Sequence, residues 1–113
     1  MITIAMTGTE KQIAWAHDII NKPVQNAEFI IAQWVGRPGF ADLESAIPAI
    51  RSAITRYEGD ISGTLAPRLS SAKTVIDKRN HFAGLLEMAI QEALKAEGRK
   101  DWAIIIANLH LYG

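Results

Sequence analysis

The chain has 113 residues, 12 basic and 12 acidic side chains, no cysteine, and apolar residues at 49% of its positions. At this length we expect one domain, residues 1–113, and the apolar content excludes an intrinsically disordered segment. Zero formal net charge argues against a uniformly charged surface for nucleic acid or membranes, and the lack of cysteine excludes disulfides and thiolate chemistry. No apolar run approaches the ~20 residues that cross a bilayer, so we expect a cytoplasmic protein without membrane contact.

The first predicted helix begins at one of two overlapping capping boxes, residues 7–10 or 9–12. Its apolar residues recur at helical spacing and include Trp15, which predicts burial over much of the helix girth. Pro23 lacks the N–H that a helix interior needs, so it either kinks one long helix or opens a second one. The turn signal at residues 36–39 ends this segment.

The next predicted helix starts at Asp42 or Ser45. If Ser45 is the N-cap, Pro48 falls at the third helical position, where its missing N–H costs little. The two glycines and one proline of residues 59–67 end the helix and predict the longest loop of the protein.

Two further helices follow. Ser70 or Ser71 caps a short one, in which Lys73 pairs with Asp77 at a spacing of four residues. After a break at residues 79–80, the segment 82–94 is the clearest amphipathic helix in the chain, and Gly98 closes it.

The last apolar segment has two interpretations. Residues 102–109 fit a helical stripe capped by Asp101, but the three consecutive isoleucines at 104–106 also suit a strand that could pair with residues 2–4. Helix is the favoured interpretation. The chain as a whole predicts an all-α fold: a compact bundle of five to six short amphipathic helices, with room for a short extended segment at the N-terminus.

Sixteen isoleucines and three tryptophans exceed the large apolar side chains that a minimal domain needs. Either all of them pack internally, or some lie at an interface with a partner or with a second copy in a homodimer.

Signals for catalysis or for a cofactor are lacking. The three histidines, His17, His81 and His110, lack metal-ligand spacing, and no nucleophile elbow or phosphate-binding loop occurs. We therefore predict neither an enzyme nor a cofactor or metal site.

The charge is unevenly distributed. It sums to −2 over residues 1–50, +3 over 51–79 and −1 over 80–113. A basic patch that meets phosphate or an acidic protein surface would consist of Arg51, Arg56, Arg68, Lys73, Lys78 and Arg79. The favoured alternative is a solvated face on which Glu58, Asp60 and Asp77 are the local partners, because no aromatic residue interleaves with these charges.

Residues 8–16, Gly-Thr-Glu-Lys-Gln-Ile-Ala-Trp-Ala, with Asp18 and Ile19 after them, resemble the opening of a group of small bacterial and prophage proteins of unassigned function. Those proteins show E-K-Q-I/V-x-W-A-x-x-I-R near the start and A-K-x-W-I-D-x-R later. Residues 72–79, Ala-Lys-Thr-Val-Ile-Asp-Lys-Arg, are similar to the second motif. The chain departs from these motifs at Val75 and Ile20, and the resemblance implies an origin in phage or other mobile elements.

Both motifs can be explained as two helices that pack on one another. The functional alternative is that their polar members line a shared groove. Together with the basic segment, the candidate partner-binding residues are Lys11, Gln12, Trp15, Arg51, Arg56, Arg68, Lys73, Asp77, Lys78 and Arg79.

From this origin and the lack of catalytic groups, we expect a non-enzymatic module that binds a host protein complex. The expected role is that of an inhibitor of a bacterial defence system, of the anti-CRISPR type, which acts by steric block. A nucleic-acid-binding accessory protein that uses residues 51–79 is the first alternative. A homo-oligomeric structural or regulatory protein is the second.

Overall fold

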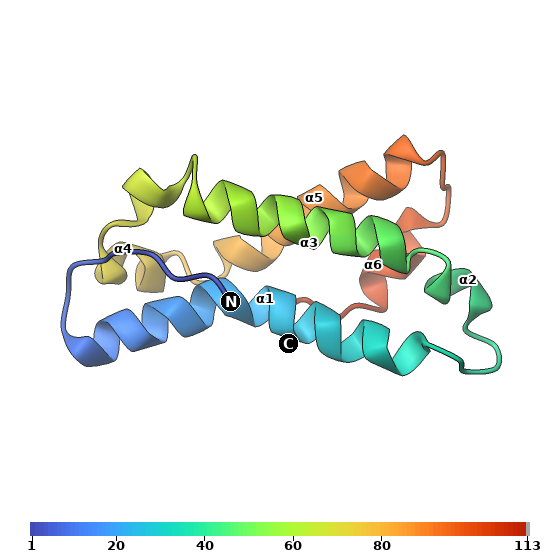
Figure 1. Cartoon of the computed structure of the whole chain (residues 1–113), viewed down its shortest axis with the longest axis horizontal. Coiled ribbons are helices and arrows are strands. Elements are labelled where there is room, and N and C mark those ends of the chain that lie inside the picture. Colours follow the sequence, from blue (N-terminus) through green and yellow to red (C-terminus); the bar gives the residue numbers. More distant parts are fainter. Residues whose placement is uncertain (113) are drawn as a thin grey trace.

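The computed structural model describes residues 1–112 and confirms the all-α fold (Figure 1). Six α-helices and one 3-10 helix follow one another along the chain: α1 Glu10–Trp34, α2 Ala41–Glu44, α3 Ile47–Ser62, η1 Ala66–Leu69, α4 Ala72–Asp77, α5 His81–Ala96 and α6 Trp102–Ala107. No helix among the described residues is both long enough and apolar enough to cross a membrane.

Three long helices build the framework. α3 packs along α5, while α1 contacts α4 through one half of its length and also contacts α5 (Figure 1). The bundle is elongated, with principal extents of 46 × 24 × 18 Å and a radius of gyration of 14.9 Å, against about 13 Å for a compact domain of this length. The short helix α6 packs on α5.

α1 is a single helix of 25 residues with Pro23 inside it, so the kink is the correct alternative of the two predicted. The two halves of α1 meet at an angle near its middle (Figure 1). Proline removes one helical hydrogen bond, and its ring clashes with the carbonyl of the preceding turn. Pro23 itself is buried, and the helix bends there and continues beyond it (Figure 1).

The N-terminal segment is extended, but it does not pair with the isoleucines of α6. It runs back along α1, where the side-chain amide of Asn21 accepts from the backbone N–H of Ile2 at 2.7 Å and donates to its carbonyl at 2.9 Å (Figure 1). Nε2 of His17 lies 3.1 Å from the N–H and 2.9 Å from the carbonyl of Ile4. Polar side chains of a helix thus occupy the place of a second strand, and residues 104–106 are free to be helical.

The helix that was predicted to start at Asp42 or Ser45 and to end at residue 59 has different bounds in the structure. Ser45 ends α2, and Ala46 is the N-cap of α3, so Pro48 is the second helical residue and not the third. α3 continues through Gly59 to Ser62, and η1 shortens the predicted loop at 59–67 further. Ile61 is fully buried, and the burial of its side chain stabilises the extra turn against the glycine.

The predicted N-cap residues of the last two short helices are confirmed in position, but not as hydrogen-bonding caps. Ser71 and Asp101 precede α4 and α6, but neither side chain makes a capping hydrogen bond. The Asp101 carboxylate instead accepts two hydrogen bonds of 3.1 Å from Arg99, which lower the pKa of Asp101. Arg99 also donates to the carbonyl of Asp42 and to the hydroxyl of Ser45, so it ties the start of α6 to α2.

The tryptophans lie in three different environments. Trp34 is buried, and the ammonium of Lys95 lies 4.5 Å from the ring centroid of Trp102 and partly covers that ring. The predicted burial of α1 over most of its girth is wrong at Trp15, which is 51% exposed. Part of the apolar surplus therefore lies on the surface of the bundle.

Candidate functional site

The six basic residues of the middle segment do not form one unpaired patch. Arg51 on α3 forms an ion pair of 3.0 Å with Glu28 of α1, and Arg56 forms one of 2.6 Å with Glu92 of α5. Of the local acidic partners that we predicted, Asp60 lies 3.9 Å from Arg56. These exposed pairs contribute about 0–1 kcal/mol each, and they neutralise the charge along α3.

The other four basic residues lie at one end of the bundle. Arg68 belongs to η1, Lys73 and Lys78 belong to α4 or its end, and Arg79 donates to the carbonyl of Ile76 at 3.2 Å. The predicted ion pair of Lys73 with Asp77 is wrong: the ion pairs among the described residues do not include it. Both side chains are exposed, where solvation competes with a weak pair.

The two motif segments pack on one another, since α1 contacts α4. Gln12 completes the capping box of α1: its N–H donates to the Thr9 hydroxyl, and its side-chain oxygen accepts from the Thr9 N–H, each at 3.1 Å. Lys11 and Trp15 are exposed on the same helix. Gln12 and Arg79 make their hydrogen bonds within the fold. One hollow is lined by both motifs, through Ile19 of the first and Arg79 of the second, and of the polar groove residues predicted only Arg79 lies there among the described residues.

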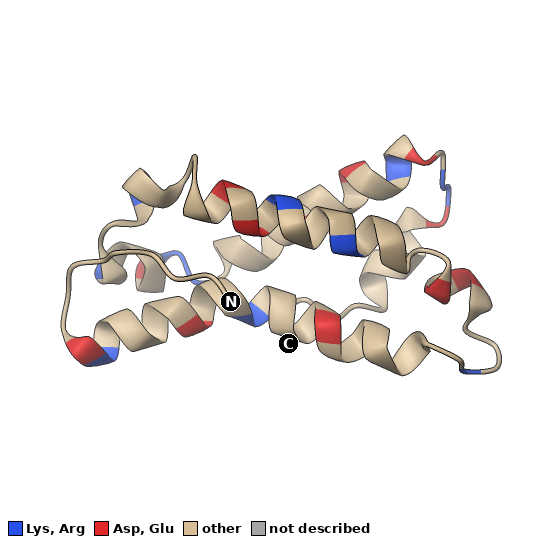
Figure 2. Cartoon of the chain, in the orientation of Figure 1, with Lys and Arg blue, Asp and Glu red and all other residues tan. Residues whose placement is uncertain are grey.

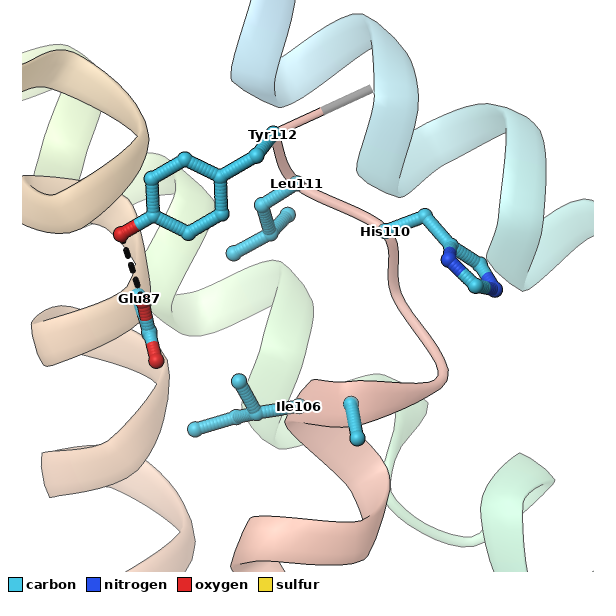
Figure 3. A pocket seen from close by; sticks show the side chains of 6 residues that line it. Glu87, Ile106, His110, Leu111 and Tyr112 are labelled. Carbon is cyan, nitrogen blue, oxygen red and sulfur yellow. Dashed lines mark hydrogen bonds between the residues drawn. The ribbon is translucent and has the colours of Figure 1, made fainter. Parts of the chain in front are cut away.

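A different surface has the character of a binding site. The last described residues, 108–112, form a tail that crosses from α6 toward α1 and α5 (Figure 3). Three hollows border this tail. The Glu87 hollow, of about 330 Å³, is lined by Glu87, Ile106, Ala107, His110, Leu111 and Tyr112. The Lys22 hollow, of about 150 Å³, is lined by Ile19, Lys22, Pro23, Arg79, Asn80, Ala83, Leu111 and Tyr112. The Phe29 hollow, of about 170 Å³, is lined by Asn26, Phe29, Ile30 and His110.

The tail is held by burial and by two side chains. Leu109 and Leu111 are buried in the core, and the side-chain amide of Asn26 donates to the Leu111 carbonyl at 3.2 Å. The Tyr112 hydroxyl donates to the carboxylate of Glu87 at 2.8 Å. This hydrogen bond raises the pKa of Tyr112, because loss of the proton would place two negative charges side by side.

The turn in the tail is made by His110, which has a φ of 50° in the left-handed region. Figure 3 shows the His110 ring pointing toward α1, away from Tyr112 and Glu87. The side chains of the tail thus reach different hollows: His110 borders both the Phe29 hollow and the Glu87 hollow, and Tyr112 borders the Glu87 hollow and the Lys22 hollow.

Large apolar side chains stand exposed beside these hollows. Phe29 is 68% exposed, Ile104 65% and Tyr112 67%. Ile104 lies one turn before Ala107, which lines the Glu87 hollow, so both are on one side of α6. Figure 2 shows that α6 carries no charged residue. We call this surface the C-terminal face and define it by Phe29, Ile30, Ile104, Ala107, His110 and Tyr112.

Sequence reasoning did not locate this face. Its only signal was the apolar surplus, which gave no position. The predicted stripe of Trp102, Ile105, Ile106 and Leu109 correctly placed Ile105 inside, where it is 1% exposed, and left Ile104 off the stripe without assigning it to a surface. Glu87 and Tyr112 are 25 residues apart and belong to no motif.

The predicted lack of a metal site concerns histidine and carboxylate side chains. Among the described residues, no group of three histidine, aspartate or glutamate side chains is placed to hold a metal ion. Asn21 is a buried polar side chain, and its amide is fully hydrogen-bonded within the fold. Comparison with protein-family models, curated proteins and solved structures finds no match for this chain.

Proposed function

We propose that this protein is a non-enzymatic, protein-binding module that inhibits a bacterial defence complex of the CRISPR effector type by steric block, and that it binds through the C-terminal face. One observation carries the binding part of this proposal: Phe29, Ile104 and Tyr112 are each about two-thirds exposed around three adjoining hollows. Clustered large apolar side chains on a grooved surface are typical of protein interfaces. The choice of target follows from the phage or mobile-element origin that the sequence resemblance implies.

Steric block fits this surface better than mimicry of nucleic acid does. A mimic needs a dense array of negative charge, whereas the hollows of the C-terminal face hold one carboxylate, Glu87, and two basic groups, Lys22 and Arg79. An apolar face gains its affinity from buried area, and a neutral protein can occupy a functional surface on its target without imitating a ligand.

The nucleic-acid alternative has less support, because Arg51 and Arg56 are each engaged by a carboxylate. The homodimer alternative would use the same C-terminal face, so the two protein-binding hypotheses differ in the partner and not in the surface.

The test compares two matched surface variants. One is the double variant Phe29→Ser/Ile104→Ser on the C-terminal face, and the control is Met88→Ser, which removes a side chain of similar exposure (60%) beside the groove between α3 and α5. Each protein is mixed with purified CRISPR effector complexes, and complex formation and target cleavage are measured. We expect binding and inhibition by the wild type and by the Met88 variant, and loss of both in the double variant.

Three results would contradict this proposal. If the wild-type protein neither binds nor inhibits any effector, a CRISPR effector complex is not its target. Loss of binding in the Met88 variant with retention in the double variant would move the interface to the other side of the bundle. A stable dimer by size exclusion with light scattering, abolished by the double variant, would make a second copy the partner.

A further inference from the structure

The Glu87 hollow combines one carboxylate with apolar walls. Its lining includes Ile106, Ala107 and Leu111, and Glu87 is its only acidic side chain. Figure 3 shows Ile106, Leu111 and Tyr112 on the side of the tail that Glu87 faces. A ligand that fits these groups has a positively charged end and a short aliphatic stem, because the stem covers the apolar walls while the charge meets the carboxylate.

Glu87 is available for such a charge. No described lysine, arginine or histidine forms an ion pair with it. Its Oε2 accepts the hydrogen bond from Tyr112, and no described residue donates to Oε1. The carboxylate therefore has one free acceptor at the edge of a half-enclosed apolar space.

The neighbouring hollow has the opposite charge. Beyond Tyr112, the lining includes Lys22 and Arg79 and no acidic side chain. The tail thus separates an acidic hollow from a basic one, and a cation is favoured on the Glu87 side alone.

The hydrogen bond from Tyr112 also discriminates between basic side chains. A guanidinium binds best to both oxygens of a carboxylate, whereas an ammonium is a compact charge that needs only one. Since Tyr112 occupies Oε2, the remaining single acceptor suits an ammonium.

We propose that the Glu87 hollow is a lysine-binding pocket, which takes the side chain of a lysine from the protein partner, with its methylenes against Ile106 and Leu111 and its ammonium at Oε1 of Glu87. This inference rests on the proposed function for the identity of the partner, but the pocket itself can be tested without a partner.

The test uses small probes of one size. The ¹⁵N-labelled protein is titrated with n-butylammonium, n-butylguanidinium and n-butanol, and the amide shifts of residues 106–112 are followed. We expect n-butylammonium to bind about tenfold more tightly than n-butanol, since the charge-assisted hydrogen bond adds to the same apolar contact. The guanidinium is expected to bind more weakly than the ammonium.

Two variants assign the effect to its groups. Glu87→Gln should make n-butylammonium bind no more tightly than n-butanol. The control is Glu92→Gln, which changes another carboxylate of α5, an exposed one that pairs with Arg56 of α3, and it should leave the preference for n-butylammonium intact. Tyr112→Phe frees Oε2 and should reverse the order of ammonium and guanidinium.

Equal binding of n-butanol and n-butylammonium to the wild type, or an unchanged preference in Glu87→Gln, would overturn the lysine pocket. Neither result bears on the loss of partner binding in Phe29→Ser/Ile104→Ser, which tests the proposed function. The two proposals can therefore fail separately.

Discussion

The end of the bundle where α1 meets α4 and the C-terminal face use their polar and apolar side chains in opposite ways. At the α1–α4 end, the side chains of Gln12 and Asn21 form hydrogen bonds with the backbone of the N-terminal segment. On the C-terminal face, Phe29 and Ile104 contribute almost nothing to the core, and one oxygen of Glu87 is unengaged. The first region builds the fold, and the second has the properties of a surface that is completed by another molecule.

The motif residues that make hydrogen bonds belong to the first region. Gln12 and Gly8 lie in or beside the first motif, and both serve local geometry: Gln12 closes the capping box, and Gly8 allows the extended segment to approach Ala72. The C-terminal face contains no motif residue. Four predictions test whether the two regions differ in this way, and they are ordered by the expected loss of stability.

Apart from the buried reference variant Ile105→Ala described below, the largest effect is expected from Asn21→Leu. The change leaves the N–H and carbonyl of Ile2 without partners in a buried position, which costs about 2–3 kcal/mol of unfolding free energy. Urea denaturation measures it, with Asn80→Ala as the control at an exposed asparagine. A loss below about 1 kcal/mol in Asn21→Leu would mean that the N-terminal segment is not held by this side chain.

Gly8→Ala should cost about 1–2 kcal/mol. Gly8 has a φ of 142°, and an added Cβ would lie 3.1 Å from both the Cβ of Ala72 and Oε1 of Gln12. The control is Gly59→Ala within α3, where no atom lies within 4 Å of the new methyl group, so that change should stabilise the protein by about 0.5–1 kcal/mol. Thermal unfolding of both variants measures the two changes in stability. If both changes had the same sign, the predicted contrast between Gly8 and Gly59 would be contradicted.

Tyr57 should make stability depend on pH in the alkaline range. Its hydroxyl is buried and donates to the Ile20 carbonyl at 2.7 Å, and burial raises the pKa of Tyr57 above its ordinary value of 10. The unfolded chain loses this proton near pH 10 and the folded one does not, so the stabilisation is complete below pH 10 and declines as the pH rises above it.

The matched variant is Tyr57→Phe, which should lose about 1 kcal/mol at neutral pH because the hydrogen bond is absent. Urea denaturation at pH 8 and at pH 11 compares the two proteins. The wild type should lose more stability between these values than the variant, and parallel declines would contradict the buried, protonated state of Tyr57.

The smallest effect on stability is expected on the C-terminal face. Phe29→Ser and Ile104→Ser should each change the unfolding free energy by no more than about 0.5 kcal/mol, because both side chains are largely exposed. Ile105→Ala, one residue along α6, should cost about 2–4 kcal/mol, since Ile105 is buried. If the Ile104 and Ile105 variants were equally unstable, Ile104 would be a core residue and the face would lose its support.

Local patterns predicted much of the fold. The capping box at Thr9 and Gln12, the break after α4 and the amphipathic α5 depend on neighbours within a few residues, which is why the sequence was sufficient for them. Predictions that needed long-range knowledge were less accurate. The end of α3 was placed too early because Gly59 outweighed Ile61 in the pattern, whereas in the fold the buried Ile61 decides.

The sequence by itself determined that this chain is helical and rich in apolar side chains, because helical periodicity and capping are local properties. Periodicity also set Ile105, on the predicted stripe of the last helix, apart from Ile104, because the two differ by a rotation of about 100° around the helix axis. Only the tertiary structure decided that Ile104 and Phe29 stay largely exposed beside the same tail, and which polar groups meet. Glu87 and Tyr112 become neighbours because the tail turns at His110 and is anchored by Leu109 and Leu111. Such contacts depend on how distant segments pack, and on this packing rest both the candidate surface and its lysine-binding pocket.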